Sequence, residues 1–437
     1  MSDWINKIEQ EIYKKENLTY FFLILIIIGL FTIHNFRALS SIGVGGFFLV
    51  AVYKTKPSEI WQKLKENKAF LFLTAIFFIH ALHIFTTDGE NLPYFWERIS
   101  IKIPFLLLPI GMIAVPKLQT KRYHLLYYLY FLILSGTAIS AMINYINHFD
   151  EINAAYLRSK TLPVIVNHVR YSLMIALGIF CGAWMLWKKV YLFHRFEKYL
   201  VGFLTLFLFG FLHLMSVRSG LVAFYIMLGL SLIYYAAQTK KYLLAFGFLT
   251  AVCIAPVVCF VAIPTFQNKI ENTLEDLSHL DDEYNANFHS LTGRVFSYRV
   301  GWTLFKENPV FGVGIGNLRH ETELQYIRDF GQIHRGKRIL AHNQFLRYLT
   351  AFGAIGFVLL MFCFYYPLIR NQNYKHDYLL FLQYVVVSVS FLFEGTLETQ
   401  LGCNLSLIFI LLPLYHLYAQ RELLSNGISK EASSTQS

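Results

Sequence analysis

Long apolar stretches separated by short polar segments dominate the pattern of this 437-residue chain. A helix that crosses the hydrocarbon core of a bilayer needs about 20 apolar residues, and most of the stretches approach that length. The pattern therefore predicts an all-α polytopic membrane protein with about twelve transmembrane helices. The predicted spans are 18–33, 38–53, 69–86, 101–115, 123–145, 166–187, 199–215, 219–237, 242–263, 341–366, 377–393 and 401–418.

Basic residues fall mainly on one side of these spans. With the N-terminus placed inside, the inner segments carry 21 Lys and Arg residues, and the short outer loops carry 5. Cytoplasmic loops of membrane proteins show this excess of positive charge. We therefore expect a multi-pass protein with both termini in the cytoplasm. The formal net charge of +11 then needs no nucleic-acid partner.

Composition supports the membrane interpretation. Hydrophobic residues make up 56% of the chain and charged residues 15%, whereas soluble domains have about 45–50% and about 25%. A free cytosolic enzyme, a disordered chain and a fibrous protein are thereby excluded. The five cysteines all lie in apolar runs, which argues against a disulfide framework and a zinc site. We expect one integral membrane domain over residues 1–437, with a disordered tail at 425–437.

One connection is long, at residues 264–340, and the charge pattern places it outside. Its first half has apolar residues at helical spacing, which predicts an amphipathic helix across the mouth of the bundle. In its second half, Thr292 can cap a helix that runs to Asn308 and stops before Pro309. The apolar positions of the first predicted helix are Phe266, Ile270, Leu274 and Leu277.

A glycine-rich turn follows at residues 312–317. Gly312, Gly314 and Gly316 occupy every second position and permit a tight turn with close packing. The turn follows a predicted helix rather than a strand, so it is not a dinucleotide-binding fingerprint. Two interpretations stay open, a plain turn and a turn whose backbone N–H groups face an anion.

Ionisable residues gather near the predicted outer ends of the spans and on the outer loop. Such groups at membrane depth are costly and indicate function by default, although a single arginine can also extend to the lipid headgroups and a glutamate can simply pair with an arginine. The candidates are Arg170 with its neighbour His168, Arg218, Arg294, His342 with Asn343, and Glu394 with Glu398.

These residue types suit one kind of chemistry. Arginine presents a planar fork that matches phosphate oxygens, and fixed cations stabilise a departing pyrophosphate. A neutral histidine can accept the proton of an attacking hydroxyl. The set therefore favours group transfer from a lipid diphosphate to an alcohol. A transporter of an anionic lipid or sugar remains an alternative, but transporter sites lie near the midplane of the membrane, and these residues do not.

Two stretches carry a family resemblance, GRVFSYRVGWTLFKENPVFGVGIGN and AHNQFLRYLTAFGAIGF. They resemble the O-antigen ligase and polymerase superfamily of bacterial envelope proteins. The matching features are Arg294, Trp302, Asn308-Pro309, Gly312 to Gly316, His342-Asn343, and a Ser-Arg-Ser-Gly type motif at Ser216 to Gly220 with Val217 inserted.

The resemblance implies a C-type membrane glycosyltransferase in the bacterial inner membrane. It implies a donor glycan on undecaprenyl pyrophosphate, a lipid A–core sugar hydroxyl as acceptor, inversion at the anomeric carbon, and no metal or other cofactor. It also implies that Arg218 and Arg294 hold the pyrophosphate and that His342 activates the acceptor. Arg170, His168, Asn343, Glu394 and Glu398 are expected to bind substrate, partly on their position alone.

Two alternatives lie closer to this interpretation than a transporter does. A polysaccharide polymerase would use a second lipid-linked glycan as acceptor, and a third type of enzyme would glycosylate a protein. Polymerases of the family tend to have two sizeable outer loops. Here the second longest outer loop, 146–165, has about 20 residues, which favours the ligase.

Overall fold

A computed structural model describes residues 2–33, 36–115, 119–157, 161–370 and 377–434. These residues form eighteen α-helices and no strand, which confirms the all-α prediction. The helices are α1 (Ser2–Thr32), α2 (Arg37–Val52), α3 (Pro57–Glu66), α4 (Lys68–Leu82), α5 (Leu92–Ala114), α6 (Thr120–Asn147), α7 (Phe149–Leu157), α8 (His168–Lys188), α9 (Glu197–Met215), α10 (Arg218–Thr239), α11 (Tyr242–Cys253), α12 (Ala255–Ala262), α13 (Pro264–Ser278), α14 (Ser290–Glu307), α15 (Leu318–Asp329), α16 (Gln344–Arg370), α17 (Tyr378–Phe393) and α18 (Gln400–Ser434). Short 3₁₀ turns lie at His83–Thr86, Gly89–Asn91, Tyr284–Asn287, Arg335–Lys337 and Thr396–Glu398.

Eight segments within the described residues are long and apolar enough to cross a membrane. They lie in α1, α4 with its following turn, α6, α8, α9, α10, α16 and α18, and a ninth forms if α2 and α3, bent by 104°, count as one span. The predicted count of twelve is therefore not confirmed, although helices lie at all twelve predicted positions. The difference comes from α17, which is short, from α5, which carries charges, and from α11 and α12, which are separated at Ile254.

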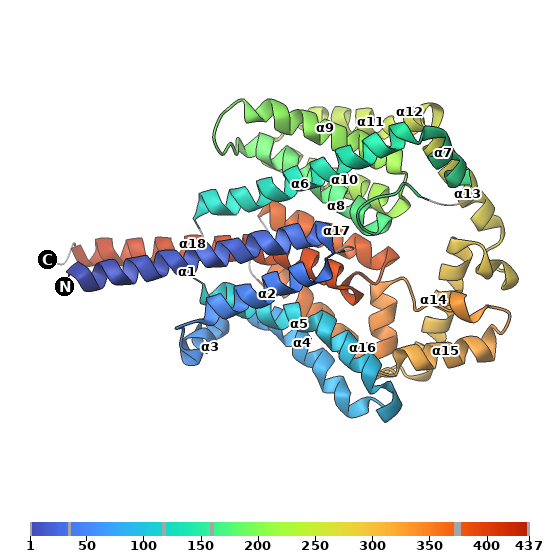
Figure 1. Cartoon of the computed structure of the whole chain (residues 1–437), viewed down its shortest axis with the longest axis horizontal. Helices are drawn as coiled ribbons and strands as arrows, with labels where there is room; N and C mark the ends of the chain where they lie inside the picture. Colours follow the sequence, from blue (N-terminus) through green and yellow to red (C-terminus); the bar gives the residue numbers. More distant parts are fainter. Residues whose placement is uncertain (1, 34–35, 116–118, 158–160, 371–376, 435–437) are drawn as a thin grey trace.

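The bundle has two distinct ends (Figure 1). α1 and α18 run side by side, and both termini lie at one end, whereas α13, α14 and α15 cover the opposite end. In α8 and α18, 83% of the candidate span is buried, against 33–50% in the other spans. These two helices therefore form the centre, and the remaining spans surround them. The separation of the termini from the loop helices agrees with the sides that the charge pattern assigns.

The long connection is helical, as predicted. α13 is the amphipathic helix, and it packs on α7, α9, α12 and α14. α14 ends at Glu307, just before Asn308 and Pro309, as expected. The capping role of Thr292 is wrong, because the N–H of Gly293 already bonds to the carbonyl of His289 and the helix starts at Ser290. The Thr292 side chain lies buried inside the first turn.

α16 is broken at Gly353, whose φ of 63° and ψ of −174° are not helical. The glycine-rich turn pairs with this break through backbone hydrogen bonds in both directions. The N–H of Gly314 bonds to the carbonyl of Ala351 at 2.9 Å, and the N–H of Ala354 bonds to the carbonyl of Pro309 at 2.8 Å. The turn therefore packs against α16, and two of its N–H groups, those of Val313 and Gly314, are used in that pairing rather than facing an anion.

Candidate functional site

Glu394 lies where four separate segments meet at the loop end of the bundle. It follows α17, and its carboxylate is 9% exposed. Arg170 Nη2 of α8 lies 3.6 Å from Glu394 Oε2, and Arg294 Nη2 of α14 lies 3.7 Å from Oε1. His342 Nδ1, just before α16, lies 3.6 Å from the same Oε1. The fold thus brings together four candidates that are far apart in the sequence.

Local contacts fix the backbone of His342. Its carbonyl accepts a 3.0 Å hydrogen bond from the hydroxyl of Tyr298, which lies one turn after Arg294 on α14. Asn343 accepts a hydrogen bond from the N–H of Leu346 and donates one to the carbonyl of Leu392 at 3.3 Å. Asn343 therefore caps α16 and ties it to the end of α17, close to Glu394.

Arg218 lies at the first position of α10 and has its own carboxylate partner. Arg218 Nη2 lies 3.6 Å from Asp276 Oδ2 of α13, and His289 Nδ1 lies 3.0 Å from Asp276 Oδ1. The charges of Arg218 and Arg294 are close enough to repel each other. Sequence reasoning did not identify Asp276 as the partner of Arg218. Its burial would have been the signal, and burial follows only from the fold.

A close approach of α8 and α10 brings Arg170 and Arg218 to the same end of the bundle. A Cβ placed on Gly220 would lie 2.4 Å from the Cβ of Ser172. Each of these small residues follows its arginine by two positions. The space beside Gly220 is therefore filled by α8.

Several nitrogen atoms around Glu394 and Asp276 have no hydrogen-bond partner within the described part of the chain. The contacts of Arg170, Arg294 and His342 with the Glu394 carboxylate are 3.6 Å or longer, beyond ordinary hydrogen-bond distance. Among the described residues, Arg170 Nε, Arg218 Nε and His342 Nδ1 are buried and have no hydrogen-bond partner. Buried polar groups normally have partners. An arrangement of cationic donors held near carboxylates, but not bonded to them, is suited to an incoming oxyanion.

The electrostatics keep Glu394 ionised. Burial by itself raises the pKa of this carboxyl, but the nearby His342, Arg170 and Arg294 outweigh burial and lower the pKa below its usual value. Glu394 therefore acts as a fixed negative charge that orients the two arginines and the imidazole.

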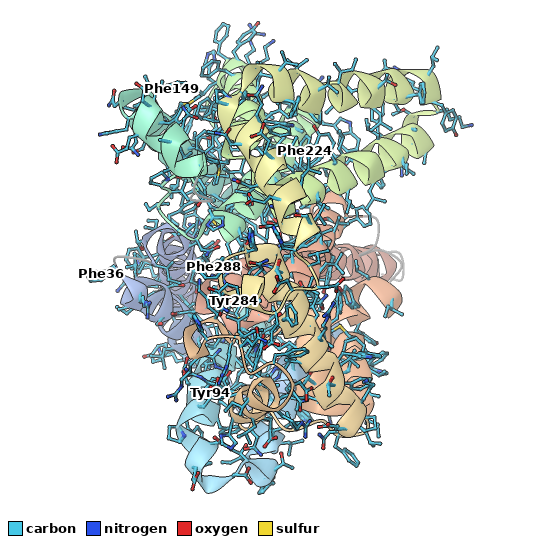
Figure 2. The ribbon with its side chains drawn as sticks, turned by 90° about the vertical axis from the view of Figure 1, so that its right-hand side faces the viewer. Phe36, Tyr94, Phe149, Phe224, Tyr284 and Phe288 are labelled. Atoms are coloured by element: carbon cyan, nitrogen blue, oxygen red, sulfur yellow. The ribbon has the colours of Figure 1, made fainter. Side chains whose placement is uncertain are left out.

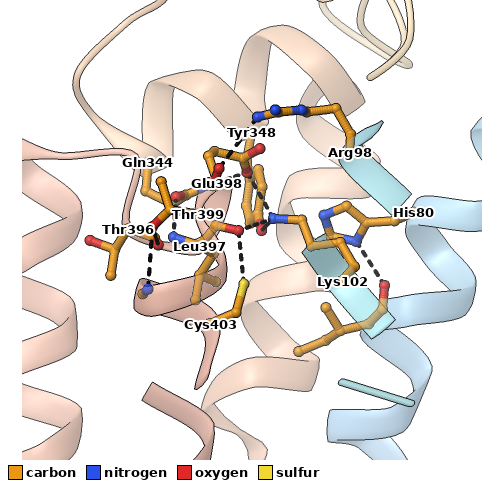
Figure 3. A network of polar contacts seen from close by, with 12 residues as sticks. His80, Arg98, Lys102, Gln344, Tyr348, Thr396, Leu397, Glu398, Thr399 and Cys403 are labelled. Atoms are coloured by element: carbon orange, nitrogen blue, oxygen red, sulfur yellow. Dashed lines mark hydrogen bonds and ion pairs between the residues drawn. The ribbon is translucent and has the colours of Figure 1, made fainter. Parts of the chain in front are cut away.

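Glu398 belongs to a separate buried network, shown in Figure 3. Its carboxylate lies 2.9 Å from Lys102 Nζ of α5 and accepts a 3.0 Å hydrogen bond from Gln344 Nε2. Lys102 also donates to the carbonyl of Leu397, and Arg98 donates to the carbonyl of Glu398 at 3.3 Å. Side-chain exposure is 0% for Lys102 and 5% for Glu398. This geometry favours positioning of the 394–400 turn over direct contact with a substrate.

Lys102 was missed at the level of sequence, although a signal for it exists. It lies inside an apolar stretch, where an ionisable residue indicates function or a paired partner. The stretch at 101–115 looked short because α5 begins earlier, at Leu92, and Lys102 lies in its middle. His168, the remaining candidate, is the first residue of α8, two positions before Arg170. Its role stays a prediction.

Metal ligands do not gather in the part of the chain that the structure describes. No group of three or more His, Cys, Asp or Glu side chains there is placed to hold a metal ion. Metal independence itself stays a prediction. The four cysteines described there are free thiols.

None of the curated proteins matches the chain. Residues 203–361 match the family model described as O-antigen ligase. The matched segment includes Arg218, Arg294 and His342, and it excludes Arg170 and Glu394. In the fold, Glu394 lies close to Arg294 and His342 of the matched segment, and Arg170 lies close to Glu394. Over residues 203–361, the family model thus supports the resemblance to the O-antigen ligase superfamily that the motifs of the sequence indicate.

Proposed function

We propose that the chain is an O-antigen ligase-type glycosyltransferase. It moves a glycan from undecaprenyl pyrophosphate to a sugar hydroxyl of lipid A–core on the periplasmic face of the bacterial inner membrane. The observation that carries this proposal is the convergence of Arg170, Arg294 and His342 on Glu394. Arg218 lies nearby, and three of these residues fall within the segment that matches the O-antigen ligase family.

The arginines act on the donor. Their unused N–H groups bind the pyrophosphate oxygens, and their charge stabilises the negative charge of the leaving group. Arg218 and Arg294 repel each other in the absence of an anion, so a pyrophosphate between them relieves that repulsion. Glu394 and Asp276 orient the guanidinium groups without occupying all their donors.

His342 acts on the acceptor. The acceptor hydroxyl oxygen attacks the anomeric carbon, and its proton passes to the imidazole. The bond between the anomeric carbon and the phosphate oxygen breaks, and undecaprenyl pyrophosphate leaves with the bonding electrons. Glu394, 3.6 Å from Nδ1, stabilises the imidazolium that forms. This reaction requires no metal, so we expect activity to survive a chelator.

The decisive experiment is deletion of the gene followed by analysis of lipopolysaccharide. Loss of long chains from lipid A, with accumulation of lipid-linked polymer, is the result expected of a ligase. Chains of a single repeat unit would identify a polymerase. Unchanged lipopolysaccharide would contradict both, and would direct attention to a protein acceptor or to transport.

A further inference from the structure

A polar cavity borders His342 at the loop end of the bundle. It has a volume of about 550 Å³ and lies between α5, α15, the turn at Arg335–Lys337 and the start of α16. Figure 2, which looks onto this end, shows Tyr94 of α5 on the same face as the loop residues Tyr284 and Phe288. The charged and histidine side chains that line the cavity, apart from His342, are Arg319, His320, Glu323, Arg335, Arg338 and Arg347.

The cavity has an excess of positive charge. Four arginines line it, and Glu323 is its only carboxylate among the lining residues. Glu323 Oε1 lies 2.8 Å from Arg338 Nη1 and 3.8 Å from Arg335 Nε. Arg338 also donates to the carbonyl of Ile333, so it is held in place by the protein itself. The single carboxylate does not neutralise the other arginines.

Arg319 and Arg347 supply the excess charge. No carboxylate oxygen of the described residues lies within ion-pair distance of either. The carboxylate of Glu398, which is near enough to Arg347 to attract it, is already paired with Lys102. Arg319 lies over the ring of Tyr94, with its guanidinium carbon 6.0 Å from the ring centroid. Arg347 Nε is buried and, among the described residues, has no hydrogen-bond partner. Cationic donors without carboxylate partners, in a polar cavity, favour an oxyanion.

His342 belongs both to this cavity and to the group of side chains around Glu394. Its Nδ1 lies 3.6 Å from Glu394 Oε1, and the residue also lines the arginine-rich cavity. The group that accepts the proton must reach the acceptor hydroxyl, and that hydroxyl must in turn reach the anomeric carbon of the donor. Arg218 and Arg294, which hold the donor pyrophosphate, and Arg170 lie beside Asp276 and Glu394 and do not line this cavity. The cavity is therefore left for the acceptor.

We propose that this cavity is the acceptor subsite and that it binds an anionic group of the acceptor glycan, a phosphate or a carboxylate, near the attacking hydroxyl. The inference rests on the proposed transferase function. It adds that the acceptor is recognised by charge, through Arg319, Arg335 and Arg347. A neutral acceptor sugar forfeits these contacts.

Equilibrium binding tests the inference without requiring turnover. The full chain in nanodiscs is titrated with purified lipid A–core and, separately, with undecaprenyl-pyrophosphate glycan. Arg319→Gln combined with Arg335→Gln removes two exposed charges of the cavity. Acceptor binding should weaken about tenfold or more, as expected for loss of charge-assisted hydrogen bonds, and donor binding should not change. Arg328→Gln is the matched control, because Arg328 is exposed on the same helix α15 and does not line the cavity.

Modified acceptors identify the anionic group. If dephosphorylated lipid A–core binds the wild type and the double variant equally, the group is a phosphate. If carboxyl-reduced lipid A–core binds the wild type and the double variant equally, the anionic group is a carboxylate. Unchanged acceptor affinity in the double variant would overturn the inference, as would weakening of donor binding alone. A wild type that binds acceptor through these arginines but never transfers glycan would instead contradict the proposed function.

Discussion

The Cβ position of Gly220 in α10 lies 2.4 Å from the Cβ of Ser172 in α8. Arg218 and Arg170 each lie two positions before this contact, so it holds two cationic side chains at the same end of the bundle. Close packing of helices in membranes commonly uses small residues in this way. The spacing of α8 and α10 is therefore a condition for the arginine cluster.

Gly220→Val should separate α8 from α10. Overpacking of this kind costs about 1–3 kcal/mol, and it should lower transfer by moving Arg170 and Arg218 apart. Thermal unfolding in detergent and a glycan-transfer assay measure the two effects. Gly229→Val, on the same helix, is the control, because a Cβ there meets nothing within 4 Å. Equal behaviour of the two variants would show that the contact is dispensable.

Arg218→Ala and Arg294→Ala should each reduce transfer strongly while the protein stays in the membrane. Loss of a group that stabilises developing charge costs on the order of 10²–10³ in rate. Lysine should rescue poorly, because an ammonium cannot make the two-pronged contact of a guanidinium. Arg299→Ala provides a control on the helix of Arg294, since Arg299 pairs with Asp281 at the surface. Near-normal transfer by both site variants would refute the pyrophosphate role.

Replacing Glu394 by glutamine (Glu394→Gln) should remove a charge that stabilises the fold, and the loss of stability should depend on pH. The pKa of Glu394 is lowered in the folded protein from a usual value of 4.5. A depressed folded pKa means that the ionised carboxylate contributes stability that is fully present above the unfolded pKa and is lost as pH falls through the folded pKa. At neutral pH, the free energy of unfolding of the wild type should exceed that of Glu394→Gln by on the order of 1–3 kcal/mol.

That difference should shrink as the pH falls below 4.5, measured as the gap between the thermal midpoints of wild type and Glu394→Gln. Glu307→Gln is the control, because Glu307 is a partly exposed residue that pairs with Arg328. A gap that stays constant from neutral to acid pH would show that the charge of Glu394 is not what stabilises the site.

His342→Gln separates proton transfer from positioning. Glutamine keeps a hydrogen-bonding side chain but cannot act as a base near neutral pH, so turnover should fall while donor binding persists through the arginines. Single-turnover transfer and donor titration measure these separately. His334→Gln, at an exposed position of the same loop, controls for the loss of a histidine. A His342→Gln variant with wild-type turnover would remove the base assignment.

Gly353→Ala should disrupt the pairing between the broken α16 and the glycine-rich turn. Gly353 has a φ of 63°, and a Cβ there would lie 2.3 Å from the backbone of Val310. Strain at such a position costs about 1–3 kcal/mol, and the clash adds to it. We expect faster proteolysis within residues 309–316. Gly336→Ala, where a Cβ meets nothing within 4 Å, should leave the cleavage rate unchanged, and equal cleavage of both variants would contradict the pairing role.

Features that depend on neighbouring residues could be predicted from the amino-acid sequence. The apolar runs located the helices, the period of Phe266 to Leu277 identified α13, and Pro309 marked the end of α14. These follow from local periodicity and backbone restrictions. The motifs around Arg218, Arg294 and His342 were also sufficient to indicate the superfamily, because each motif is a short run of consecutive residues.

Which of these residues meet depends on the tertiary fold. Arg170 and Glu394 are more than 200 positions apart, and Lys102 and Glu398 are 296 apart. Glu394 joins the arginines and His342, whereas Glu398, four residues later, turns inward to Lys102. No local pattern distinguishes these two glutamates. Their surroundings are created by the packing of α5, α8, α14, α16 and α17, and the burial of a charge with one partner rather than another is a property of that packing.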